Sequence, residues 1–146
     1  MSMEQASRKP RVLLVDDEER FRTTLGKLLT VHGLSVSTVG SGTDALEELK
    51  KGGYDVILLD VKMPGMDGMT TLAEIKKIDR NLEVIMLTGH ASVDVAVEIM
   101  RLGGYEYLLK PCPVEEILEK VEAAFERKAT RESRLKKGAA SPAPTV

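Results

Sequence analysis

Five short apolar runs recur along this chain at intervals that restrict the folds open to it. They begin near residues 12, 34, 56, 83 and 105. These intervals are too long for hairpins and suit repeated strand-helix units. Between the runs, apolar residues recur at helical spacing, as Phe21, Leu25, Leu28 and Leu29 do. The alternation predicts an α/β fold, with a parallel sheet, right-handed crossovers and helices on both faces.

The composition of the runs predicts where each strand lies in the sheet. The runs that begin at Val12, Val56 and Val84 are continuously apolar, which is typical of central strands buried on both faces. Leu34–Val39 alternates apolar with small polar residues, so we expect it at a sheet edge. Tyr105–Leu109 is predicted to form the fifth strand.

Length, charge and cysteine content narrow the class of protein. A chain of 146 residues fits one domain with a real core, and a net charge of -2 favours protein or small-ion partners. Residues 1–10 lack a signal-peptide pattern, and no stretch is long enough to span a membrane, so we expect a cytoplasmic protein without membrane contact. The single cysteine, Cys112, excludes an internal disulfide and suits a reducing compartment.

Three segments are predicted: a flexible leader over residues 1–10, a folded domain over residues 11–126 and a basic extension over residues 127–146. The extension continues the last helix, which begins near Pro113, and frays into a disordered tail because residues after Gly138 lack a core pattern. Its basic residues are Arg127, Lys128, Arg131, Arg134, Lys136 and Lys137. No aromatic residues accompany them to stack on bases, so direct nucleic-acid binding is not expected.

Polar residues follow four of the predicted strands where each strand leaves the core. Asp16 and Asp17 follow the first strand, Asp60 the third, Thr88 the fourth and Lys110 the fifth. If the first and third strands are parallel neighbours, the three carboxylates meet at one edge of the sheet. Like charges so close resist ionising together unless a cation joins them, so the cluster predicts a hard divalent metal ion.

These residues together resemble the receiver (CheY-like) domain of bacterial two-component response regulators, over about residues 11–126. The resemblance rests on Asp16, Asp17, Asp60, the loop Met63–Gly68, Thr88, Tyr107 and the pair Lys110–Pro111. It implies a flavodoxin-like, doubly wound sheet with strand order 2-1-3-4-5. The segments Gly89–Ser92 and Tyr105–Pro111 look most like receivers of enhancer-binding transcription activators.

The resemblance also implies a chemistry for the site. Asp60 would accept a phosphoryl group from a sensor histidine kinase or a phosphotransfer protein. Mg²⁺, with Mn²⁺ as the alternative ion, would be held by Asp17, Asp60 and the backbone carbonyl of Lys62, with Asp16 acting through a water. Lys110 would offset charge on the phosphoryl oxygens. The domain would catalyse its own phosphorylation and dephosphorylation without being a conventional turnover enzyme.

A switch is implied as well. Thr88 would move toward the phosphoryl group and Tyr107 would turn inward, which would repack the surface of the fourth helix, fifth strand and fifth helix for a downstream protein or a self-dimer. In the fourth helix, residues 92–102, two apolar stripes are present. Val93, Ala96, Val97 and Met100 are assigned to the core, and Val95, Ile99 and Leu102 to an exposed partner surface.

Four details are specific to this chain. The resemblance implies that Lys62 and His90 lie where side chains modulate the attack of water on an acyl phosphate. Gly104 stands where many receivers have alanine, so the start of the fifth strand is expected to be looser. Cys112, between two prolines at a helix start, is a candidate for a lowered thiol pKa. The Lys110–Pro111 bond is expected to be cis by resemblance.

Two other interpretations stay open. A Mg²⁺-dependent aspartyl-phosphate phosphohydrolase would also use Asp60 as a nucleophile, but it needs a second acid close after it and a substrate cap. Here Val61 and Lys62 follow Asp60, and no insertion could form a cap. A receiver fold that binds partners without phosphorylation is the other alternative, and the full set of site residues argues against it.

Overall fold

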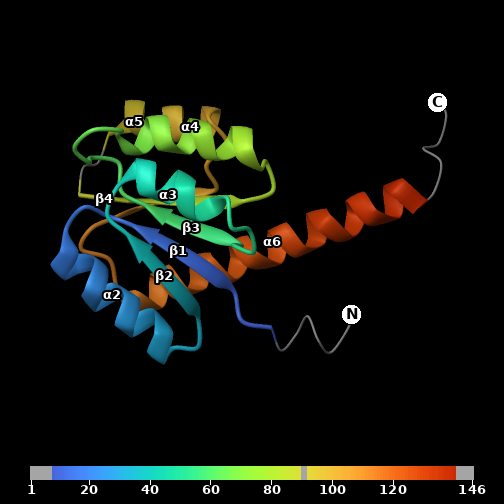
Figure 1. The fold of residues 1–146 in the computed structure, drawn as a ribbon, viewed down its shortest axis with the longest axis horizontal. Helices are drawn as coiled ribbons and strands as arrows, with labels where there is room; N and C mark the ends of the chain where they lie inside the picture. The colour runs from blue at the N-terminus through green and yellow to red at the C-terminus, as the bar shows by residue number, and fades with distance from the viewer. Residues whose placement is uncertain (1–7, 90–91, 141–146) are drawn as a thin grey trace.

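The predicted strands form one five-stranded parallel sheet in a computed structural model that describes residues 8–89 and 92–140 (Figure 1). The order is β2-β1-β3-β4-β5, so the predicted fold class is confirmed. The strands are β1 (Arg11–Val15), β2 (Ser35–Val39), β3 (Val56–Leu59), β4 (Glu83–Thr88) and β5 (Glu106–Leu109). The three central strands are the continuously apolar ones, and β2 lies at an edge, as expected.

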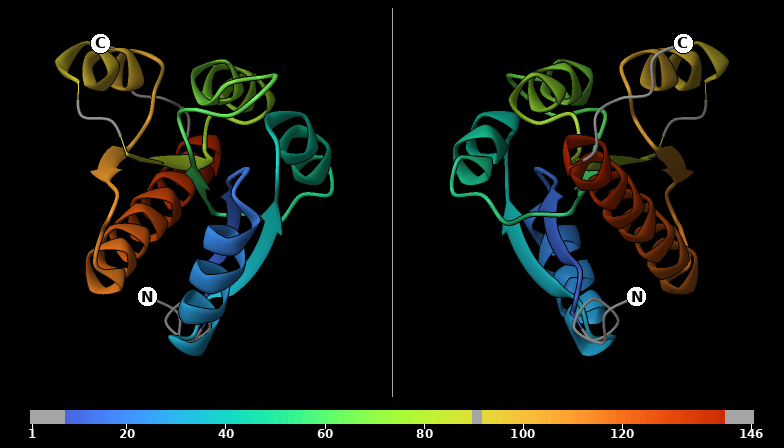
Figure 2. Two further views of the ribbon diagram at one scale, coloured as in Figure 1. Left: turned by 90° about the vertical axis from the view of Figure 1, so that its left-hand side faces the viewer. Right: turned by 90° about the vertical axis from the view of Figure 1, so that its right-hand side faces the viewer.

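Two layers of helices enclose the sheet (Figure 2). The helices are α2 (Glu19–Val31), α3 (Gly42–Leu49), α4 (Gly68–Ile78), α5 (Val93–Arg101) and α6 (Val114–Ala140). One core cluster joins the sheet to α3, α4 and α5, and a second joins its other face to α2 and α6. Within the described ranges, none of these helices has the length and apolar character needed to cross a membrane.

Burial of the central strands supplies the main stabilisation and makes them rigid supports for the residues that follow. Ile57, Leu58 and Leu59 of β3 are fully buried. Each such side chain contributes about 1.5–3 kcal/mol through its removal from water. The strand ends at the carboxyl edge of the sheet, where Asp60 follows directly, so a well-packed element positions this acid.

The turn after β3 brings α4 directly against the backbone of Asp60. The Asp67 side chain caps α4 by accepting a hydrogen bond from the backbone N–H of Thr70 at 2.8 Å. The N–H of Gly68 donates to the carbonyl of Val61 at 2.8 Å. A Cβ at Gly68 would lie 2.1 Å from the carbonyl oxygen of Asp60, so only glycine fits here.

The prediction that Val95, Ile99 and Leu102 form an exposed face of α5 is wrong. Ile99 is fully buried in the cluster formed with α3 and α4, and Val95 and Leu102 pack against that cluster. Three of the four residues assigned to the core instead face solvent: Val93, Val97 and Met100 are 79%, 60% and 59% exposed, while Ala96 is half-buried.

The segment before β5 lies close to the buried side of α5. Gly104 donates its N–H to the carbonyl of Ile99 at 2.9 Å, and a Cβ at Gly104 would lie 2.5 Å from Cγ2 of Ile99. Glycine therefore allows this segment to approach the Ile99 side of the helix closely. Helical spacing revealed two apolar stripes, but packing against the sheet, α3 and α4 decides which one is buried.

Helix α6 continues from the domain into the predicted basic extension without a break and runs beyond the sheet (Figure 1). At the other terminus, residues 8–10 of the predicted leader are joined to the domain. The carbonyl of Pro10 accepts the N–H of Ser35 at 3.1 Å, and Arg8 pairs with Asp55 at 3.0 Å. The leader prediction for residues 1–7 and the tail prediction for residues 141–146 lie outside the described residues.

Candidate functional site

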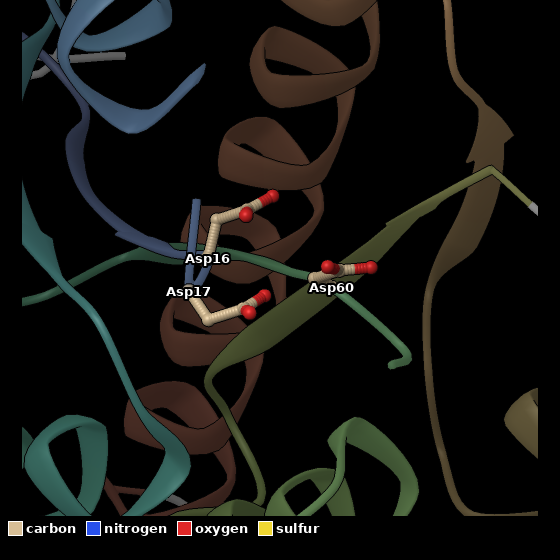
Figure 3. A group of neighbouring side chains, drawn as sticks. All are labelled: Asp16, Asp17 and Asp60. Carbon is tan, nitrogen blue, oxygen red and sulfur yellow. The ribbon is translucent and has the colours of Figure 1, made fainter. Parts of the chain in front are cut away.

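The predicted acidic cluster forms at the carboxyl edge of the sheet, because β1 and β3 are parallel neighbours. Asp16, Asp17 and Asp60 each offer a carboxylate oxygen, and these oxygens lie within 4.8 Å of one another (Figure 3). Asp16 and Asp60 are only 1% and 8% exposed, whereas Asp17 is exposed. Two buried acids and one accessible acid therefore share a single site.

Lys110 is brought to this cluster from the end of β5. Its Nζ lies 2.6 Å from Oδ2 of Asp16 and 3.7 Å from Oδ2 of Asp60. Its backbone N–H donates to the carbonyl of Thr88 at 2.7 Å, and the Lys110–Pro111 bond is cis, as expected. One ammonium group thus lies beside three carboxylates, which leaves the cluster with excess negative charge.

The electrostatics of Asp60 reflect this imbalance. Burial raises the pKa of its carboxyl above the ordinary value, and the charges of Asp16 and Asp17 raise it further. The Lys110 ammonium and the backbone N–H of Lys62 act against this shift but do not cancel it. The carboxylate of Asp60 is therefore held in an environment that favours neutralisation by a proton or a cation.

Two contacts that the sequence did not reveal orient the site. The Nζ of Lys110 lies 4.1 Å from the centroid of the Phe21 ring, a cation–π contact. Arg22 donates from Nη1 to the backbone carbonyl of Asp16 at 2.7 Å. Both residues lie in the first turn of α2, where helical spacing identified Phe21 only as a core position. No local signal could connect it with a lysine so distant in the chain.

The donor set fits a hard divalent cation. Carboxylate oxygens are the ligands that Mg²⁺ and Mn²⁺ prefer, and the three acids outnumber the one neighbouring ammonium group. Burial, and after it the charges of Asp16 and Asp17, raise the pKa of Asp60, and a cation at the cluster would offset both effects. Lys62 donates its N–H to Asp60, while the metal-binding role of its carbonyl stays a prediction.

The predicted switch residues lie on β4 and β5, two neighbouring strands of the sheet. Thr88 ends β4 and is buried, and it is paired in register with Leu109. Tyr107 is half-buried and packs against the core cluster of α3, α4 and α5. Their movement on phosphorylation stays a prediction. His90, which is expected to influence the attack of water on the acyl phosphate, lies outside the described residues.

An apolar cleft of about 460 Å³ opens beside Lys110, between the beginnings of α2 and α6. Its lining includes Phe21, Leu25 and Ile117. Cys112 also lines it, and the prediction of a lowered thiol pKa is wrong. Burial raises the pKa of Cys112, and the neighbouring Glu116 carboxylate adds to the shift. The position between two prolines at a helix start suggested a lowered pKa, but the thiol faces an apolar wall and an acid.

Comparison with known families bears directly on this geometry. The family model described as "Response regulator receiver domain" matches residues 12–122. The chain belongs to this family. Receiver domains are signalling domains of two-component systems rather than conventional enzymes.

Similar proteins in other organisms are regulators. The transcriptional regulatory protein YkoG of Bacillus subtilis is 35% identical over 123 residues, which cover 84% of this chain and 54% of that protein. The DNA-binding transcriptional regulator NtrC of Klebsiella pneumoniae is 39% identical over 112 residues, covering 77% of this chain and 24% of that protein. The expected likeness to receivers of transcription activators is confirmed, and the receiver spans only part of each relative's length.

Solved structures agree with the fold. A receiver domain protein from Clostridium thermocellum is 36% identical, with a TM-score of 0.79, and the match covers 83% of this chain and 98% of that one. A CheY-like receiver domain protein from Methanospirillum hungatei is 25% identical, with a TM-score of 0.81, and the match covers 85% of this chain and 99% of that one.

Proposed function

We propose that this receiver accepts a phosphoryl group on Asp60 from a sensor histidine kinase or a phosphotransfer protein, in a reaction that requires Mg²⁺. The observation that carries the proposal is the position of Asp60. It is a largely buried carboxylate at the end of a rigid strand, with two acids and the Lys110 ammonium group beside it. A carboxylate so placed is suited to act as a nucleophile toward phosphorus.

The residues of the chain divide the work of transfer. An oxygen of Asp60 forms the new bond to phosphorus as the bond from phosphorus to the donor imidazole nitrogen breaks. Lys110 holds positive charge 3.7 Å from that carboxylate, where the phosphoryl oxygens would accumulate negative charge. Asp17, Asp60 and the carbonyl of Lys62 would hold Mg²⁺, with Asp16 acting through a water. When bound, the ion would neutralise phosphoryl charge.

The apolar cleft beside Lys110 supports a protein as the phosphoryl donor. It borders the site, and its Phe21, Leu25 and Ile117 side chains present an apolar wall. A small donor such as acetyl phosphate does not need this wall, but a helix that carries a phosphohistidine could bury an apolar face against it. The cleft would thus place the donor imidazole near Asp60.

The orientation of α5 indicates which surface of the receiver would bind a partner after phosphorylation. Val93, Val97 and Met100 form an exposed apolar stripe, and Leu109 of β5 is 45% exposed. Movement of Thr88 and Tyr107 after phosphorylation would repack the neighbouring surface of α5, β5 and α6. A downstream protein or a second copy of the receiver would then cover the apolar stripe.

Acetyl phosphate provides a direct test. The purified protein is incubated with acetyl phosphate and Mg²⁺, and a mass increase of one phosphoryl group is measured. We expect the increase for the wild type and for Asp44→Asn, an exposed control in the first turn of α3. We expect none for Asp60→Asn or in the presence of a chelator. If the folded wild type gains no mass with acetyl phosphate and also none with a cognate kinase, a receiver that acts without phosphorylation would be favoured.

A further inference from the structure

A second cleft, of about 1050 Å³ and rich in basic residues, lies where the ends of α4 and α5 face the distal part of α6. It is remote from Asp60, because it adjoins the start of β4 at the amino edge of the sheet. Among the described residues of its lining, Asp79 is the one acid. The basic residues of its lining are Lys76, Lys77, Arg80, Arg101, Arg127 and Arg131.

The basic side chains of this cleft carry more positive charge than the neighbouring carboxylates neutralise. Arg127 and Arg131 both form ion pairs with the same oxygen of Glu83, Oε2, at 3.1 and 3.3 Å. Glu83 is buried, so one carboxylate serves two guanidinium groups. Lys76 lies close by and donates to the carbonyls of Arg80 and Leu82. Burial lowers the pKa of Lys76, and the charges of the two arginines lower it further against the opposing effect of Glu83.

Several donors in the cleft remain available to a ligand. Across residues 8–89 and 92–135, no acceptor is found for the Arg80 guanidinium group or for the Nη atoms of Arg127. Asp79 already accepts the N–H of Asn81 at 2.8 Å. Lys77 has only an exposed ion pair with a neighbour on its own helix, and such pairs are weak.

We propose that this basic cleft binds a small anion that carries at least two phosphate groups, with the size of a nucleoside diphosphate. Guanidinium groups bind phosphate oxygens in a bidentate manner, and two arginines with available donors line one cleft. Ile78, Leu102 and Leu135 add aliphatic surface that an organic group of the ligand can cover. A bound anion would fasten the distal part of α6 to α4 and α5.

Binding of pyrophosphate and ADP to the full chain tests the proposal. Isothermal titration calorimetry is done at low salt without divalent metal ions, so that the Asp60 site does not retain phosphate. The test variant is Lys77→Gln/Arg80→Gln, and the control is Lys27→Gln/Lys50→Gln. The control removes the same charge: Lys50, like Lys77, has an exposed pair at i,i+3, and Lys27, like Arg80, is exposed with no ion pair among the described side chains.

We expect pyrophosphate to bind the wild type and the control equally, and the test variant about tenfold more weakly, as the loss of charge-assisted contacts predicts. Amide shifts in NMR spectra should concentrate in residues 76–81, 101–103 and 127–135. If ADP binds more tightly than pyrophosphate, its nucleoside contacts the aliphatic side chains. If the two bind equally, the cleft recognises the phosphates alone. Either result supports the proposed site.

Three outcomes would overturn the proposal. The first is no binding of pyrophosphate to the folded wild type. The second is an equal loss of affinity in the test and control variants, since general attraction would then explain it. The third is a set of amide shifts confined to the edge with Asp60. A single-stranded oligonucleotide that binds more tightly than pyrophosphate and shifts amides along exposed α6 instead would replace the small anion with nucleic acid.

Discussion

At the carboxyl edge of the sheet, Asp60 shares one lysine with two other acids, whereas at the amino edge Asp55 has three partners of its own. Arg8 donates to both oxygens of Asp55 at 3.0 and 3.2 Å, the backbone N–H of Arg11 donates at 2.8 Å and Lys128 at 3.3 Å. Burial opposes ionisation of Asp55, but these hydrogen bonds keep its pKa below the ordinary value. The pKa of Asp60 is raised.

The comparison shows how one residue type acquires two roles at the two ends of buried strands. The hydrogen-bonding capacity of Asp55 is filled by groups that also tie the leader and α6 to the start of β3, so its charge serves structure. Asp60 lacks such partners, and a cation or covalent modification can neutralise its unfavourable negative charge. The imbalance of charge, rather than burial, distinguishes the reactive edge from the structural one.

Removal of the Asp55 charge, at the amino edge, should have the largest effect on the free energy of unfolding. Asp55→Asn leaves Arg8 without its ion pair and Lys128 buried without that carboxylate. We expect a loss of about 3 kcal/mol in the free energy of unfolding, as for other broken buried pairs. Asp17→Asn, at the opposite edge, should leave the stability unchanged or raise it. Urea unfolding followed by circular dichroism measures both, and equal losses would refute the contrast between the edges.

A divalent cation should stabilise the protein by neutralising the acids at the carboxyl edge of the sheet, and it should have no such effect at the amino edge. Mg²⁺ at 100 times its dissociation constant is expected to raise the free energy of unfolding of the wild type by about 2.7 kcal/mol. Asp17→Asn should lose most of this gain because one of the predicted ligands is missing. Thermal unfolding with and without Mg²⁺ is the measurement, with Asp55→Asn as the control that should still respond. A gain that persists in Asp17→Asn would place the ion elsewhere.

The two carboxyls should impose opposite pH dependences on stability in metal-free buffer. The folded-state pKa of Asp60 is raised, so its contribution is present below the ordinary value of 3.8 and is lost as pH rises through the folded pKa. The folded-state pKa of Asp55 is lowered, so its contribution is present above 3.8 and is lost as pH falls through the folded pKa.

Asp60→Asn should therefore stabilise the protein near neutral pH by about 0.5–2 kcal/mol, the range typical of relieved active-site residues. The decline in stability above the ordinary aspartate pKa should become shallower in this variant. Asp55→Asn should instead reduce the gain in stability as pH rises. Unfolding free energies from pH 3 to pH 7 check both variants, and a steeper decline in Asp60→Asn would contradict the sign derived for its carboxyl.

The smallest effect concerns the cation–π contact at the carboxyl edge. Phe21→Leu keeps an apolar side chain but removes the ring next to Lys110. We expect the rate of phosphorylation by acetyl phosphate to fall two- to fivefold, since such contacts contribute about 0.5–1 kcal/mol. Phe21→Tyr, which retains a ring, should restore the rate. An identical reduction in both variants would indicate a change in packing rather than in the position of the ammonium group.

Much of the carboxyl edge was predictable from the sequence, while the amino edge was not. Asp16, Asp17 and Asp60 each follow a continuously apolar run, and parallel strands bring such ends together. Asp55 and Glu83 stand before such runs, where an acid has the same local pattern as a solvated loop residue. Their partners, such as Arg8 and Arg131, come from distant segments, so only the folded chain reveals that these acids are buried and paired.

The sequence by itself determined the alternation of strands and helices, the central strands and the set of acids at one edge, because these depend on the order and periodicity of apolar residues. The tertiary structure decided that Ile99 rather than Val97 is buried, that Phe21 contacts Lys110 and that basic residues of α6 line a cleft. Periodicity shows that a helix has apolar faces, but packing against other elements decides which face leaves water.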